Sequence, residues 1–90
     1  MATQILAIGA GAANSADVVV AVGTPLTVAL KAGSAPRVGA GRVDILLKDD
    51  SGNYWRVDTL TAGNPALVIS GPGTYRFSRI GGGSCGVFSA

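Results

Sequence analysis

The sequence predicts an all-β chain, either an antiparallel β-sandwich or a small barrel of about seven or eight short strands. Strand-like runs recur at intervals of roughly ten residues, and turn-forming residues separate them. No segment shows the amphipathic pattern of a helix of about ten residues or more. The stretch from Arg42 to Ile80 reads as strand, tight turn, strand, and further turn-forming residues that lead into another strand.

The sequence predicts an N-terminal arm and a Gly/Ala-rich hinge at residues 1–14. The β-sandwich domain is predicted to follow at residues 15–90. Residues 4–8 form a short apolar run. The glycine-rich stretch after this run is too poor in large side chains to form a stable element. We therefore expect the arm to lie outside the sandwich.

The domain begins with two strands and a loop. Residues 15–22 alternate as a strand does, and we expect its core face to carry Val18, Val20 and Val22. A turn leads into a second alternating strand at residues 26–31, which can pair with the first. Residues 32–41 are rich in glycine and contain a proline, so they predict a loop long enough to cross between sheets.

A hairpin is predicted next. Residues 43–47 form its first strand, and residues 49–53 (DDSGN) supply Asx turns and a glycine that tolerates positive φ. In the second strand we expect Trp55 to face the core, with Arg56 and Asp58 together on the opposite face.

Three strands complete the domain, at residues 66–70, 74–80 and 86–89. Alternation places Phe77 in the core. Tyr75 follows a Gly-Pro-Gly turn, as the tyrosine corner of Greek-key sandwiches does, so we expect its hydroxyl to tie down a neighbouring connection. The last strand is predicted to lie at a sheet edge.

Catalytic residue types are scarce. No histidine or glutamate occurs in the 90 residues, and Cys85 is the one cysteine. The usual bases, nucleophilic triads and metal clusters cannot be built from these residues within one chain, so we expect no enzyme activity, no cofactor and no metal. The spacing of Asp49, Asp50 and Asp58 places no two of them around a shared cleft. Cys85 is predicted to be a small buried thiol.

Charge and hydrophobicity point to a protein partner. The net charge is +2 without a basic run, so we expect no nucleic-acid partner. No apolar run approaches the roughly 20 residues that cross a bilayer, and no basic residue precedes the first apolar stretch as in a secretory signal. We therefore expect no membrane association and synthesis in the cytoplasm. Hydrophobic residues make up 48% and charged residues 13%, which indicates that some apolar surface meets another protein.

Two motif-like segments have simpler interpretations. Gly9 and Gly11 imitate a dinucleotide-binding turn, but strand-like sequence follows where that fold needs a helix. The turn at residues 49–53 is rich in oxygen ligands, but it lacks the late bidentate carboxylate of a calcium loop. The segment with Gly9 and Gly11 is therefore interpreted as part of the hinge. Residues 49–53 are interpreted as a turn whose polar side chains stabilise its backbone.

Three segments carry a family resemblance, and these are the hairpin VDILLKDDSGNYWRVDTL (residues 43–60), the segment SGPGTYRFSR (residues 70–79) and the GVF ending. In these segments the chain resembles small virion proteins of tailed bacteriophages. The chain is most similar in style to head decoration, or capsid cement, proteins. The resemblance implies a β-sandwich or jelly-roll-like protomer that forms a homo-oligomer, with a trimer favoured. It also implies a place on the capsid surface, where the protein clamps adjacent major capsid subunits after synthesis in the host cytoplasm. It implies no catalytic residues.

Two functional hypotheses follow. The first is a non-enzymatic virion protein that binds and stabilises the major capsid protein lattice. Its candidate intersubunit contacts lie near the chain ends and are Ile5, Leu6, Ile8, Val87 and Phe88. The alternative is a phage tail accessory protein or a carbohydrate- or receptor-binding module, whose exposed patch is lined by the further candidate interface residues Tyr54, Arg56 and Arg76.

Overall fold

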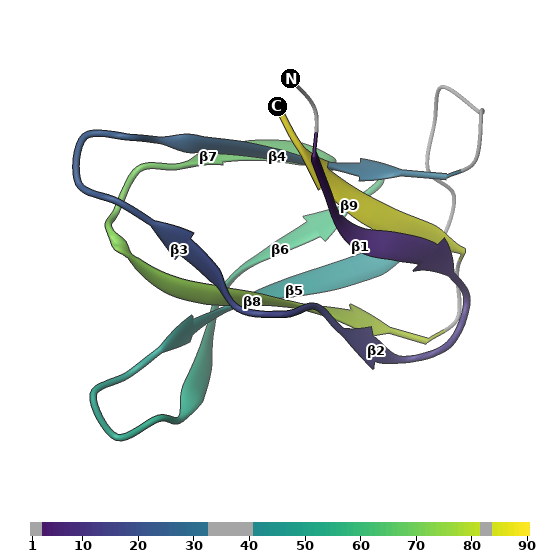
Figure 1. Ribbon diagram of the computed structural model, residues 1–90. Coiled ribbons are helices and arrows are strands. Elements are labelled where there is room, and N and C mark those ends of the chain that lie inside the picture. Colours follow the sequence, from purple (N-terminus) through teal and green to yellow (C-terminus); the bar gives the residue numbers. More distant parts are fainter. Residues whose placement is uncertain (1–2, 33–40, 82–83) are drawn as a thin grey trace.

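The computed structural model describes residues 3–32, 41–81 and 84–90. These residues form nine β-strands and no helix. The strands make two antiparallel sheets, which lie face to face (Figure 1). The predicted all-β class is therefore confirmed. The loop predicted at residues 32–41 lies almost entirely outside the described residues.

The first sheet has the strand order β1-β9-β4-β7. Its members are β1 (Thr3–Gly9), β4 (Leu26–Lys31), β7 (Ala66–Ile69) and β9 (Cys85–Ser89). Residues of β4 alternate between the core and the outer face, as predicted. The first and last strands of the chain are neighbours in this sheet.

The second sheet has the strand order β2-β8-β5-β6, and β3 also pairs with β8. Its members are β2 (Ala13–Asn14), β3 (Val18–Val20), β5 (Arg42–Lys48), β6 (Tyr54–Thr61) and β8 (Gly73–Ile80). The short strands β2 and β3 pair with successive parts of β8. They therefore border the same edge of the sheet.

The strand pairs are nested around the turn at residues 49–53. β5 pairs with β6 across that turn. Further from the turn, β4 pairs with β7, and β8 pairs with both β2 and β3. The outermost pair is β1 with β9. Each strand therefore finds a partner on the other arm of one long hairpin. Successive pairs alternate between the two sheets, so folding this hairpin over itself brings two apolar faces together.

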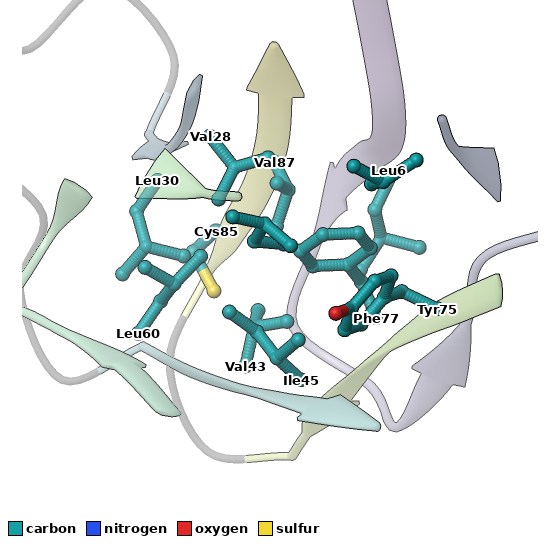
Figure 2. Packing of buried hydrophobic residues seen from close by; sticks show 12 residues of the cluster. Leu6, Val28, Leu30, Val43, Ile45, Leu60, Tyr75, Phe77, Cys85 and Val87 are labelled. Carbon is teal, nitrogen blue, oxygen red and sulfur yellow. The ribbon is translucent and has the colours of Figure 1, made fainter. Parts of the chain in front are cut away.

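One hydrophobic core lies between the sheets. Figure 2 shows its buried side chains, which come from both sheets and point toward one another. Phe77 is fully buried, so its predicted core position is confirmed. Other large, fully buried side chains include Ile45, Leu60, Val28, Val43, Val87 and Cys85. Each such burial contributes about 1.5–3 kcal/mol for the larger aliphatic and aromatic side chains, so apolar packing is the main stabilising contribution.

The predicted N-terminal arm is instead the edge strand β1. Residues 3–9 pair with β9, and Leu6 belongs to the core cluster. The predicted C-terminal edge strand is instead an interior strand, because β1 and β4 flank β9. Both differences have one cause, which is the pairing of the first strand with the last. A pairing between the two ends of the chain leaves no local sequence pattern from which it could be predicted.

Gly86 allows β1 to approach β9 closely. A Cβ atom added at Gly86 would lie 2.5 Å from the Leu6 carbonyl oxygen and 2.9 Å from the Ile8 backbone nitrogen. The pairing of the two strands is irregular on both sides of Leu6. Close backbone approach, rather than an unusual φ, therefore requires glycine at this position.

Arg79 is buried near the end of β8 and ties three segments together. Its Nε donates a hydrogen bond to the Gly11 carbonyl oxygen (2.6 Å), and its Nη1 donates to those of Ala7 (2.7 Å) and Cys85 (2.9 Å). Within the described part of the chain, no aspartate forms an ion pair with it. The three carbonyl groups therefore offset the cost of burying the guanidinium. A Cβ at Gly9 would lie 2.7 Å from Nη2, so glycine there leaves room for the charge.

Tyr75 fixes the other end of β8. Its hydroxyl donates a hydrogen bond of 2.8 Å to the Gly71 carbonyl oxygen. This bond ties the turn between β7 and β8 to the strand. The predicted tyrosine-corner contact is therefore present.

A β-bulge in β6 separates two residues that were expected to share a face. The register of β6 against β5 shifts between Arg56 and Asp58, which makes Val57 an extra residue. Asp58 consequently lies on the core-side face together with Trp55, while Arg56 lies on the outer face. The expectation that Arg56 and Asp58 share a face is wrong.

Trp55 was predicted to lie in the core, and this prediction is also wrong. The side chain is 63% exposed. Trp55 does lie on the core-side face, opposite Leu47, but the closed end of the β5–β6 hairpin projects away from the first sheet (Figure 1). Alternation identifies the face of a strand; it does not reveal whether a second layer covers that face.

Replacing Gly86 by Ala is expected to destabilise the protein by about 1–3 kcal/mol, the usual range for overpacking. The added methyl group would meet backbone atoms of β1, which cannot move aside without disturbing the pairing with β9. Equilibrium unfolding in urea, followed by circular dichroism, measures the change. Gly11→Ala is the matched control, because nothing lies within 4 Å of a Cβ there. Equal stability of the two variants would contradict the close approach.

Candidate binding surface

A polar cluster surrounds Tyr54 on the outer face of the second sheet. The Tyr54 hydroxyl lies 2.8 Å and 3.0 Å from the two carboxylate oxygens of Asp17 and donates to this carboxylate. Lys48 Nζ lies 3.7 Å from Asp17 Oδ2, and Arg76 Nη2 lies 3.6 Å from Asp17 Oδ1. We call these four residues the Tyr54 cluster. It joins β5, β6 and β8 to the segment that precedes β3.

Arg76 covers one face of the Tyr54 ring. Its Cζ lies 3.8 Å from the ring centroid, and its Nη2 donates a 3.0 Å hydrogen bond to the Tyr54 hydroxyl. Its Nε is buried and has no hydrogen-bond partner among the described residues. Cation–π contacts at exposed sites contribute about 0.5–1 kcal/mol. The cluster therefore holds Tyr54 in place, and one ring face is closed to a ligand.

The three residues of the predicted exposed patch do share one face. Arg56 and Arg76 lie opposite Leu46 on its two sides, and Tyr54 lies on the same outer face of β6. Arg56 is exposed, whereas Tyr54 and Arg76 are half-buried. The structure thus brings the three together, but Tyr54 and Arg76 are engaged with each other.

The candidate contacts near the chain ends lie mainly inside this chain. Leu6 and Val87 belong to the core cluster, and Ile5 packs against it. Phe88 is half-buried, and of the five only Ile8 is exposed. An intersubunit contact through Leu6 or Val87 would require β1 or β9 to leave the core.

Trp55 is the surface residue that sequence reasoning missed. Its indole Nε1 donates a 2.8 Å hydrogen bond to Asp49 Oδ2. Asp49 Oδ1 in turn accepts hydrogen bonds from the backbone nitrogens of Ser51 (2.9 Å) and Asn53 (2.8 Å). The turn fixes Asp49, and Asp49 fixes the indole. The available signal was that Asp49 opens the predicted turn and Trp55 lies two residues after its end.

The same hydrogen bonds lower the pKa of the Asp49 carboxyl below its ordinary value of 3.8, with the largest effect from Trp55. A pKa that is lower in the folded state than in the unfolded state stabilises the fold above the unfolded value. This contribution is lost as the pH falls through the folded-state pKa of Asp49. The stability that Asp49 contributes to the hairpin turn therefore depends on pH in the acidic range.

Large hydrophobic side chains are exposed on the edge strands and in one turn. Val19 of β3 is 74% exposed, and Val22 in the turn that follows is 82% exposed. The sequence pattern grouped Val22 with core residues, but β3 ends at Val20, so the alternation stops before it. Val57 on β6 and Val68 on β7 are also exposed, and both strands end their sheets.

Cys85 is a fully buried free thiol, as predicted. Burial raises its pKa, although the nearby charge of Arg79 opposes the shift. Within the described residues, no three His, Cys, Asp or Glu side chains gather as metal ligands. The same part of the chain holds no helix that is long and apolar enough to cross a membrane.

Comparisons with protein-family models, with curated proteins and with solved structures found no match to this chain. The established class is therefore that of an all-β chain with two antiparallel sheets. Its function is inferred below from its own residues and geometry.

Acidification is expected to release the Trp55 side chain. Protonation of Asp49 weakens its acceptor oxygens, and this occurs below pH 3.8, as the pH falls through the folded-state pKa. Trp55 is the one tryptophan of the chain, so an acid titration of its fluorescence measures the release. The Asp49→Asn variant has no carboxyl to titrate and should lack this transition. Identical titration curves for the two proteins would contradict the coupling.

Proposed function

We propose that the two sheets form a jelly-roll β-sandwich. Support comes from the strand orders β1-β9-β4-β7 and β2-β8-β5-β6, whose pairs nest around one hairpin. A jelly roll has eight strands in two sheets. Here β2 and β3 count as one interrupted strand. Ser15 bridges the interruption, because its backbone nitrogen donates to the Phe77 carbonyl oxygen (2.8 Å) and its Oγ accepts from the Phe77 nitrogen (3.0 Å).

We further propose that the chain is a non-enzymatic structural protein of a tailed-phage virion, a capsid decoration protein that binds and stabilises the major capsid protein lattice. Jelly rolls occur in viral capsid and lectin domains, so the fold is compatible with this role without selecting it. The observation that carries the proposal is the exposure of Val19 and Val22, which we call the valine pair. They are the two most exposed large hydrophobic residues among those described.

The valine pair supports partner binding because large apolar side chains that stay in contact with water favour burial against another protein. Val19 lies in the middle of β3, and Val22 lies three positions later, in the turn that follows this strand. In the proposed assembly they contact a capsid subunit. A homo-oligomer, with a trimer favoured, presents several copies of the pair, and binding stabilises each small protomer by mass action.

Cosedimentation with capsids tests the proposal. Emptied capsids of the phage that encodes the chain, lacking their decoration protein, are mixed with the purified full chain. The native chain is expected to pellet with the capsids. The double variant Val19→Asp, Val22→Asp is expected to bind at least about tenfold more weakly, because two charges would be desolvated in an apolar contact, and tenfold corresponds to about 1.4 kcal/mol.

Ala62→Asp is the control, because it adds a charge at an exposed position in the turn between β6 and β7. Circular dichroism verifies that each variant is folded. Failure of the native chain to bind would contradict the capsid role, and equal binding by the double variant and the control would contradict the valine pair. Deletion of residues 1–14 is unsuitable, because it removes β1 and Leu6 from the fold.

A further inference from the structure

We infer that Trp55 forms a carbohydrate-binding platform that receives a single neutral sugar ring on the uncovered end of β6. This site differs from the valine pair, and it does not depend on binding to a capsid. Three features support it: the exposure of the indole, its fixed orientation, and the acceptor group beside it.

The indole offers a flat apolar surface to solvent. Trp55 is 63% exposed and lies on the core-side face of β6, where the hairpin projects beyond the first sheet. Its Nε1 is already bonded to Asp49, so a ligand can contact the ring only through its face or its free edge. Aromatic faces stack well on one face of a sugar ring because its C–H groups form an apolar surface that contacts the electron-rich aromatic face.

The indole is also held in one orientation. The hydrogen bond from Nε1 to Asp49 is 2.8 Å long, and Asp49 is itself bound by two backbone nitrogens of the turn. A side chain that is fixed before binding loses less conformational entropy when a ligand arrives. Trp55 is therefore pre-organised, unlike an exposed tryptophan without a polar partner.

Asp58 supplies the polar part of the platform. The bulge at Val57 turns Asp58 onto the same face as Trp55, and the two residues lie opposite positions two apart on β5. This register corresponds to about 7 Å along the strand, which suits one sugar ring. Asp58 Oδ1 accepts from the Thr59 nitrogen (2.8 Å), whereas Oδ2 has no hydrogen-bond partner within the described residues. Oδ2 is thus available to accept from a sugar hydroxyl.

A neutral sugar fits better than a cation. Asp49 already accepts hydrogen bonds from the indole and from two backbone nitrogens of the turn, so its carboxylate is engaged within the chain. Asp58 therefore offers the acceptor oxygen beside the indole, and one acceptor next to an apolar ring face matches a ring with C–H and O–H groups. Tyr54, on the other side of the strand, cannot serve in the same way because Arg76 covers one face of its ring.

Titration of the full chain with neutral oligosaccharides tests the inference. The probes are the tetrasaccharides of glucose in α-1,4 and β-1,4 linkage, of β-1,4 mannose and of β-1,4 N-acetylglucosamine. At least one is expected to produce a saturable change in the fluorescence of Trp55. Calorimetry then compares variants: Trp55→Ala should weaken binding at least about tenfold and Asp58→Asn several-fold, whereas Tyr54→Phe should bind as the native chain does.

Several outcomes would overturn the inference. One is the absence of saturable binding to any of the four probes. Another is a response to arginine ethyl ester or tetramethylammonium alone, which would identify a cation site. Equal losses in Tyr54→Phe and Trp55→Ala would assign the binding to the outer face. The valine-pair double variant should retain sugar binding, so failure of this inference and failure of the capsid role are distinguishable.

Discussion

Burial of the inner face of β8 is the constraint on which the rest of the structure depends. Three alternate residues of this strand, Tyr75, Phe77 and Arg79, are buried between the sheets. Tyr75 ties down the preceding turn, Phe77 fills the core, and the Arg79 guanidinium binds carbonyl oxygens at the other end. Because β8 also pairs with β2, β3 and β5, the second sheet assembles around it. A change on this face would therefore disturb both layers at once.

The nested pairing determines which strands are left at the edges. β1 and β7 end the first sheet, and β6 ends the second opposite the short strands β2 and β3. Unpaired edges invite association with other chains, and bulges are one way to limit it. The bulge in β6 interrupts its pairing with β5 and places Asp58 on the same face as Trp55. This irregularity at an edge strand thus builds the proposed platform.

The surface divides into regions with different physical roles. The Tyr54 cluster gathers a guanidinium, an ammonium and a phenol around the Asp17 carboxylate. It holds the segment before β3 against the sheet, so its role is structural. The valine pair and Trp55 instead leave apolar surface in water. Together the two proposals describe a chain that attaches to a particle through one surface and contacts sugars through another.

The sequence by itself determined the features that depend on neighbouring residues. Alternation and turn chemistry were sufficient for the all-β class, for burial of Phe77, and for the turn in which Gly52 takes a φ of 87°. Only the tertiary structure decided the pairing of β1 with β9, because its partners lie at opposite ends of the chain. The same holds for Arg79, whose bond to the Ala7 carbonyl oxygen spans 72 residues. Trp55 could not be placed either, since its exposure depends on whether a second layer lies over its face, which a strand pattern does not record.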